Sequence, residues 1–187
     1  MEIIRRLLAL LVISSVAILA IHVSSTVAAQ SRVVSQVIRD TCQQATHPDF
    51  CVSVLSSDDR SLGRKYPGQL TYLAIVISYE KAKEGRNHVA DEEKKTTDPL
   101  VKKILNYCLD RYDIGAVDGT ESAIKEFDNG NKRLAAIDLS AVFGPLDECI
   151  GAFNRPPYPA NPIGATNELV TKYCYLALEL LHSVGGK

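Results

Sequence analysis

Apolar residues recur three and four positions apart along most of the chain, which is the spacing that predicts amphipathic helices. The first such segment covers residues 32–45, where valines and an isoleucine share one face. Pro48 then interrupts the pattern, and residues 50–55 form a short return helix. We therefore expect residues 32–57 to fold as a helical hairpin at the N-terminal side of a larger helical unit.

Four longer helical patterns follow this hairpin. They run from residue 66 or 67 to about 88, from 98 to about 128, from about 131 to 153, and from about 166 to 183. The links between them are short, and no strand-like alternation or internal repeat competes with the helical pattern. The sequence therefore predicts an all-α fold, an up-and-down four-helix bundle over residues 66–184 that the hairpin precedes.

Single residues predict local features of these helices. Asp98 followed by Pro99 is typical of a helix start, with the aspartate as N-cap and the proline in the first turn. Gly115 and Gly119 should weaken the second helix by about 1 kcal/mol each relative to alanine. Pro145 should kink the third helix, because a proline inside a helix removes one backbone hydrogen bond.

Two charged or polar segments are expected to be irregular, and the last helix is expected to bury one face. Residues 58–61 are predicted to form a polar loop, and the charged run 91–95 a solvated helix end or loop. The last helix is predicted to turn one stripe inward, consisting of Leu169, Tyr173, Leu176, Leu180 and Val184.

The N-terminal region has the pattern of a secretory signal peptide. Two arginines precede an almost wholly apolar run over residues 7–23, and small residues at 27–29 form a cleavage site. An uncleaved membrane anchor is the alternative, but the run is short for a membrane span and contains serines. We expect a signal peptide over 1–29 and a secreted domain over 30–187, with no membrane association after cleavage.

The charge balance argues against polyanionic partners. The 187-residue chain carries 21 Lys and Arg against 22 Asp and Glu, which gives a net charge of −1 at pH 7. Proteins that bind nucleic acid or anionic membranes through electrostatics normally present an excess of positive charge. The length fits a single domain, and we expect no nucleic acid partner.

All five cysteines, Cys42, Cys51, Cys108, Cys149 and Cys174, lie in the predicted mature chain, where an oxidising compartment favours pairing. The sequence alone allows many pairings, but the spacing favours two. Cys42 and Cys51 lie close across a proline turn, and an antiparallel helix pair would place Cys108 opposite Cys149. Through loop closure, the small loop between Cys42 and Cys51 would then add about 2.7 kcal/mol to stability, and the large loop between Cys108 and Cys149 about 4 kcal/mol. Cys174 would remain a free thiol, buried in the last helix.

Catalytic and metal-binding patterns are almost absent. His47, His88 and His182 are far apart, and none has a partner at ligand spacing. A cysteine–histidine dyad would need Cys174 to be exposed with a lowered pKa, which its apolar neighbours disfavour. The adjacent carboxylates in the polar segments are typical of solvated charge and not of a glycosidase pair. The sequence predicts no catalytic residue, no enzyme activity, no cofactor and no metal site.

A set of short motifs nevertheless indicates a family. In chain order they are Thr41-Cys42, Pro48, Phe50-Cys51, Leu55-Ser56-Ser57-Asp58, Arg60-Ser61, Asp98-Pro99, Cys108 with Tyr112, and Cys149 with Phe153. Over residues 32–184 this pattern resembles the plant invertase and pectin methylesterase inhibitor family. The resemblance implies a hairpin followed by a four-helix bundle, with the same two bridges. It also implies a secreted inhibitor that blocks the active-site cleft of a carbohydrate enzyme in a one-to-one complex, in the apoplast or cell wall or in the vacuole.

The resemblance also supplies candidate contact residues. In the invertase branch a Pro-Lys-Phe tripeptide between the two bridged helices reaches into the target cleft, and the matching positions here are Lys132, Arg133 and Leu134. Only the basic middle position is kept. In the pectin methylesterase branch a threonine usually precedes the fourth cysteine, where this chain has Glu148. The implied partner is therefore pectin methylesterase or invertase, and the residues do not choose between them.

Two other kinds of function stay open. A secreted interaction or signalling bundle would keep the scaffold without an inhibitory surface, and the departures at 132–134 and at Glu148 favour it. A carrier of small ligands would need an internal cavity, against which the large side chains of the predicted inward stripes argue.

Overall fold

The computed structural model describes residues 36–185, and the predicted signal peptide over 1–29 lies outside them. Within this range the backbone forms helices and no strand, which confirms the predicted all-α fold class. Residues 36–42 are helical. The elements that follow are α2 (Pro48–Ser56), the 3-10 helix η1 (Asp59–Ser61), α3 (Pro67–Lys95), α4 (Pro99–Arg111), the π-helical segment η2 (Tyr112–Val117), α5 (Asp118–Asp128), α6 (Lys132–Ala141), α7 (Phe143–Phe153) and α8 (Gly164–Gly185).

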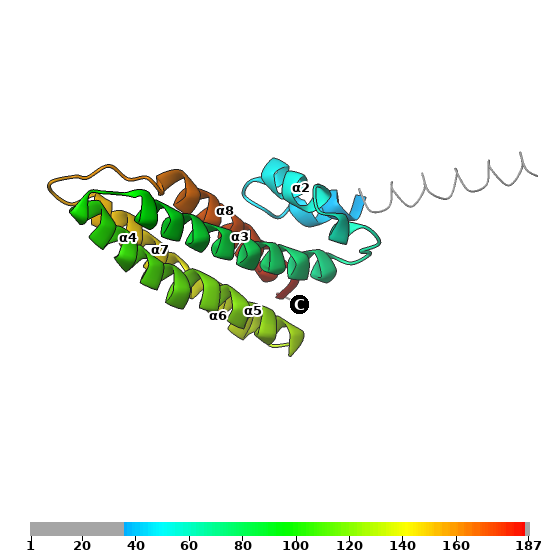
Figure 1. The fold of residues 1–187 in the computed structure, drawn as a ribbon. Helices are drawn as coiled ribbons and strands as arrows, with labels where there is room; N and C mark the ends of the chain where they lie inside the picture. The colour runs from blue at the N-terminus through cyan, green and yellow to red at the C-terminus, as the bar shows by residue number, and fades with distance from the viewer. Residues whose placement is uncertain (1–35, 186–187) are drawn as a thin grey trace, which may run out of the picture.

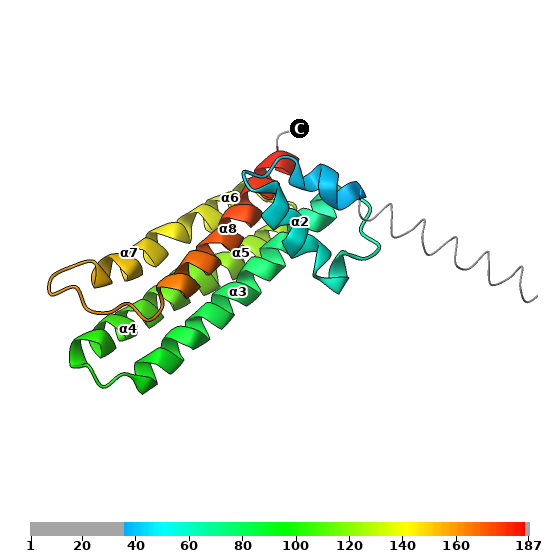
Figure 2. The same cartoon turned by 90° about the horizontal axis from the view of Figure 1, so that it is seen from above.

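These elements build four antiparallel rods, as predicted. The rods are α3, the continuous stretch α4–η2–α5, the pair α6–α7, and α8, and α3 lies along α8 (Figure 1). The hairpin formed by residues 36–42 and α2 packs at the end of the bundle where α3 begins and α8 ends (Figure 2). One buried apolar cluster joins the hairpin to α3, α5, α6 and α8, and a second joins α3, α4, η2, α7 and α8.

Helix α3 is longer than its sequence pattern predicted. The charged run 91–95, predicted as a solvated end or loop, is helical and forms the last turns of α3. Lys95 pairs with Glu92 at 2.8 Å across one helical turn, and Val89 before this run is fully buried. No glycine or proline interrupts residues 86–97, so the helix continues until the extended Thr96.

The start of α4 and the turn before α6 follow the sequence. Asp98 caps α4, because one carboxylate oxygen accepts hydrogen bonds from the backbone N–H groups of Leu100 and Val101 at 2.8 and 3.2 Å. Between α5 and α6, Gly130 adopts a φ of +78°, which a residue with a side chain rarely adopts. The tight turn reverses the chain between the second and third rods.

The two glycines of the second rod have a packing role that helix propensity does not reveal. A Cβ on Gly115 would lie 2.5 Å from the Cβ of Pro145, and one on Gly119 would lie 2.9 Å from Cγ2 of Val142. The glycines therefore let the second and third rods approach each other. The kink expected at Pro145 is a break at Val142, where α6 ends and α7 begins.

The inward face of α8 differs from the predicted stripe. Leu176 and Leu180 are buried as expected, but the side chain of Leu169 is 46% exposed. The buried face instead includes Val170 and the polar Asn167, whose side chain accepts a hydrogen bond from the Tyr112 hydroxyl at 3.2 Å. The sequence pattern counted only apolar positions, so it could not predict a buried face that contains the polar Asn167.

Both disulfides expected from the cysteine spacing are present. Cys42 is bonded to Cys51 inside the hairpin, with 5.5 Å between Cα atoms, and Cys108 is bonded to Cys149 between α4 and α7, with 4.9 Å. Cys174 is a free, fully buried thiol on α8. Burial raises the pKa of this thiol to about 12, so it is protonated at neutral pH and a poor nucleophile.

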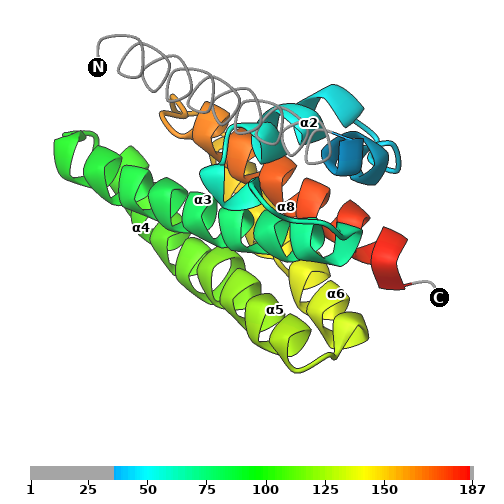
Figure 3. The same ribbon diagram turned by 90° about the vertical axis from the view of Figure 1, so that its right-hand side faces the viewer.

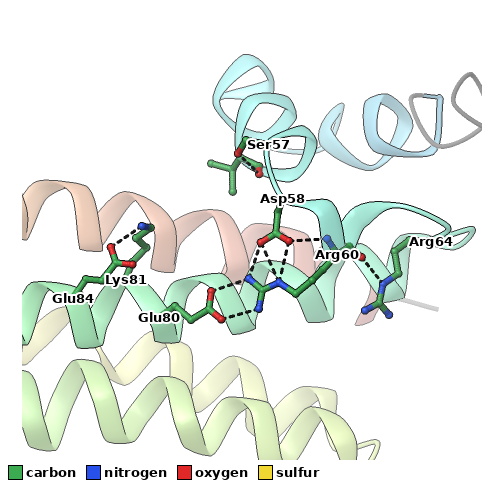
Figure 4. A network of polar contacts seen from close by, with 8 residues as sticks. Ser57, Asp58, Arg60, Arg64, Glu80, Lys81 and Glu84 are labelled. Carbon is green, nitrogen blue, oxygen red and sulfur yellow. Dashed lines mark hydrogen bonds and ion pairs between the residues drawn. The ribbon is translucent and has the colours of Figure 1, made fainter.

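The polar segment 58–61, predicted as a loop, contains the short 3-10 helix η1 (Asp59–Ser61). Asp58 accepts a hydrogen bond from the backbone N–H of Arg60 at 2.8 Å and so caps η1. The Arg60 guanidinium lies between two carboxylates, with 2.6 Å to Asp58 Oδ2 and 2.7 Å to Glu80 Oε1 on α3 (Figure 4). This ion-pair network ties the chain that leaves the hairpin to the middle of α3.

The close contact between the second and third rods predicts unequal effects of two glycine substitutions. Gly115→Ala should lower the free energy of unfolding by about 1–3 kcal/mol, because the new methyl overlaps Pro145. Gly151→Ala on α7 meets no atom within 4 Å and should raise stability slightly through helix propensity. Urea unfolding followed by circular dichroism measures both, and equal effects would contradict the packing explanation.

The Arg60 network predicts an acid-dependent stability. The hydrogen bond from Arg60 holds the pKa of Asp58 below its ordinary value of 3.8. The contribution of Asp58 to the free energy of unfolding is therefore complete above its ordinary pKa. This contribution is lost as the pH falls through the lowered pKa of the folded state. The wild type should lose more stability than Asp58→Asn between pH 5 and 2.5, as urea titrations would measure. The exposed Asp147→Asn serves as control and should follow the wild type.

Burial of Cys174 predicts its reactivity. In the native protein a thiol reagent such as dithionitrobenzoate should find no accessible thiol, because the side chain is fully buried. In guanidinium chloride without reductant it should find one thiol per chain, since the other four cysteines are bonded. Fast reaction of the native protein would show that the last helix opens readily or that Cys174 is exposed.

Candidate functional site

The predicted contact residues 132–134 lie at the first turn of α6, directly after the turn between α5 and α6. This turn lies at the end of the bundle where α3 begins and α8 ends (Figures 1 and 3). The backbone N–H of Asn131 donates to the carbonyl of Glu126 at 2.8 Å, which closes the turn. The three side chains are thus presented from a fixed backbone at the tip of two antiparallel rods.

The three side chains of this tip do not play equal parts. The Lys132 ammonium donates to the backbone carbonyl of Val184 at 3.0 Å, so it caps the end of α8. Arg133 is exposed and forms no hydrogen bond or ion pair within residues 36–185. Leu134 beside it is 47% exposed. Arg133 and Leu134 are therefore available to a partner, whereas Lys132 already has a structural role.

A shallow groove of about 690 Å³ continues from this tip along α6 and α8. Its lining includes Arg133, Ile137 and Leu181, with His182 at the α8 side. Ile137 is 53% exposed one turn after Leu134, so the outer face of α6 shows an apolar strip beside a cation. Such a surface fits a partner that combines carboxylates with apolar contacts.

Glu148, the other candidate contact, lies in a different part of the bundle. The helical rise places it about 24 Å along the third rod from Lys132, so the structure does not bring these candidates together. Its carboxylate accepts hydrogen bonds from the Tyr107 hydroxyl at 3.0 Å and from Arg111 at 3.3 Å. The hydrogen bond that Tyr107 donates to Glu148 raises the pKa of Tyr107. Glu148 therefore links α7 to α4 beside the second disulfide.

Tyr107 and Arg111 are the partners that sequence reasoning missed. They lie four positions apart on α4 and flank Cys108, with the Arg111 guanidinium 5.1 Å from the centre of the Tyr107 ring. Because Cys108 is bonded to Cys149, residues next to Cys108 must face residues next to Cys149. The expected bridge together with helical periodicity could have predicted this cluster.

The remaining chemical groups do not gather into a reactive site. His47, His88 and His182 come from the hairpin, α3 and α8, and within residues 36–185 no group of three or more histidine, cysteine or acidic side chains could hold a metal ion. Among the same residues, no helix has both the length and the apolar content of a membrane span. The surface at the α5–α6 turn, with its exposed Arg133 and Leu134, is thus a candidate binding surface.

Comparisons with known proteins show the family of this chain. The profile of the family described as plant invertase/pectin methylesterase inhibitor matches residues 36–180. A pectinesterase inhibitor of Actinidia deliciosa is 24% identical over 152 residues, which cover 81% of this chain and 81% of that protein. A cell wall / vacuolar inhibitor of fructosidase 2 of Arabidopsis thaliana is 27% identical over 146 residues, covering 78% and 79%.

A solved structure shares the fold. The crystal structure of a mutant form of a pectin methylesterase inhibitor from Arabidopsis superposes with a TM-score of 0.63 at 18% identity, covering 75% of this chain and 92% of that one. Since the family profile spans most of the chain and the fold agrees, this protein belongs to the plant invertase/pectin methylesterase inhibitor family and is an enzyme inhibitor rather than an enzyme.

Proposed function

We propose that this protein is a secreted inhibitor of an acid invertase, which it blocks by inserting Arg133 and Leu134 at the α5–α6 turn into the catalytic cleft. The observation that carries the proposal is the exposed Arg133, which is without an ion pair in residues 36–185 and stands next to the exposed Leu134. Family membership supports a carbohydrate enzyme as the target. The Arabidopsis relative, which is named as an inhibitor of fructosidase, supports this branch.

The chemistry of the target supports the same assignment. Glycoside hydrolases generally act through a pair of carboxyl groups on either side of the scissile bond. A guanidinium is the side chain best suited to pair with a carboxylate in two parallel hydrogen bonds. Arg133 keeps the basic middle position of the tripeptide, and Leu134 supplies an apolar side chain where the branch has phenylalanine. The disulfide-linked bundle holds both in place, so little conformational entropy is lost on docking.

Inhibition of pectin methylesterase is the second candidate. The α4–α7 face favours it, because the exposed Tyr107 and Glu148, together with the half-buried Arg111, offer aromatic and charged groups away from the tip. The relative from Actinidia deliciosa bears the name pectinesterase inhibitor. The two candidates use different faces of the bundle, so substitutions on each face separate them.

Titration of the purified protein against both enzyme types at pH 5 tests the assignment. Acid invertase activity should fall to near zero at one equivalent of inhibitor, and pectin methylesterase activity should not change. Inhibition of pectin methylesterase alone would replace the first candidate by the second. Loss of neither activity would reject inhibition and favour a non-inhibitory interaction bundle on the same scaffold.

Reversal of the charge at the tip should abolish most of the inhibition. Arg133→Glu should weaken invertase inhibition at least tenfold, since truncating one member of a buried charge pair costs about 2–5 kcal/mol. Arg155→Glu, an exposed arginine beyond α7 at the far end of the bundle, is the matched control and should leave inhibition unchanged. Equal inhibition constants for the two variants would contradict a role for the tip.

A further inference from the structure

The loop between η1 and α3 exposes apolar side chains beside cations. Leu62 and Tyr66 at its two ends are each 67% exposed, among the highest values for large apolar side chains in residues 36–185. Arg64 and Lys65 lie between them. Single exposed apolar residues are common on protein surfaces, but two of them flanking two cations in five residues are a feature that calls for an explanation.

This loop is held in place by its own hydrogen bonds. The Arg64 guanidinium donates to the backbone carbonyl of Arg60 at 3.0 Å, and Arg60 is fixed between Asp58 and Glu80 (Figure 4). The Gln69 side chain accepts from the backbone N–H groups of Lys65 and Tyr66 at 2.9 and 3.3 Å. A loop ordered in this way loses little entropy when a partner binds.

The loop lies next to the tip that carries Arg133. A hollow of about 470 Å³ runs between them and is lined by Arg64, Tyr66, Phe127, Asp128 and Lys132, among others. Lys132 also lines the groove along α6 and α8 and a third hollow that reaches Pro67 and Val184. Three hollows thus meet at Lys132, and they connect the loop, the tip and the end of α8.

The size of a stable interface argues that more than the tip must touch the target. A specific protein–protein interface buries about 800 Å² on each partner and involves about 20–30 residues a side. Two side chains at the first turn of α6 supply only a small part of that area. Besides the strip on α6, the loop is an adjoining surface with exposed apolar area, and its exposed Lys65 matches the carboxylates expected around a glycosidase cleft.

We propose that the loop Leu62–Tyr66 is a second arm of the docking surface, on which Tyr66 packs against the rim of the target cleft while the exposed Lys65 pairs with a carboxylate there. This inference rests on the proposed function, since the partner is the inhibited enzyme. A second copy of this chain fits the surface less well. A two-fold contact centred on the loop would bring Arg64 and Lys65 close to the same cations of the other copy.

Two variants test the loop without disturbing the fold. Tyr66→Ser removes the aromatic ring and places serine, a favourable N-cap residue, at the N-cap position of α3. Lys65→Glu reverses one exposed charge. Their matched controls are Tyr158→Asn, a tyrosine 69% exposed in the link between α7 and α8, and Lys103→Glu on α4. Both controls lie at the opposite end of the bundle (Figure 2). Thermal unfolding of each purified protein checks that all four variants are folded.

The dissociation constant and association rate for acid invertase are then measured for each protein. Tyr66→Ser should weaken binding at least tenfold, and Lys65→Glu should slow association with a smaller salt dependence than the wild type, as expected for a rim charge. Both controls should bind within twofold of the wild type.

Three outcomes would overturn the inference. If the wild type binds and both loop variants bind equally well, the loop is not part of the surface, while the proposed function stands. If sedimentation shows a wild-type dimer that Tyr66→Ser dissociates without any loss of invertase binding, the loop is a contact between copies. If the wild type binds no invertase, the proposed function fails and this inference fails with it.

Discussion

The seam between the second and third rods is the constraint on which the candidate surface depends. Along this seam Cys108 is bonded to Cys149, and Gly115 and Gly119 let Pro145 and Val142 approach to distances that any side chain would prevent. Together these contacts fix how far each rod can slide along the other. The α5–α6 turn joins the same two rods, so the register of the seam determines where Arg133 and Leu134 stand.

Much of this architecture could be predicted because it depends on local pattern. Helical periodicity, the Asp98-Pro99 start and the turn at Gly130 each act within a few residues, and the cysteine spacing limits the possible pairings. The predicted end of α3 was wrong, because the charge of residues 91–95 suggested a solvated helix end or loop. Charged residues that pair across one helical turn are good helix formers, and the helix continues through them. The predicted inward face of α8 was partly wrong, because the core contains the polar Asn167. Its side-chain oxygen accepts a hydrogen bond from the Tyr112 hydroxyl, so its burial leaves this acceptor paired.

Other features could not be predicted because they join residues that are distant in sequence. Arg60 and Glu80 form an ion pair across 20 positions, and Lys132 donates to the carbonyl of Val184 across 52. The second contact changes the meaning of the candidate site, since a lysine expected to meet the target is engaged within the chain. The family resemblance predicted the tip as a contact surface, and only the packing of the end of α8 shows that, among the residues that the structure describes, Lys132 is engaged while Arg133 is not.

The outward orientation of the tip has a consequence for how such proteins diversify. Arg133 and Leu134 project from a backbone held by the turn and by Lys132, and neither belongs to either buried cluster. Under the proposed function, substitutions there would change what the molecule binds while costing the scaffold little. A gene duplicate could therefore acquire a new target by a few mutations at this position, long before the helices that carry it have noticeably diverged.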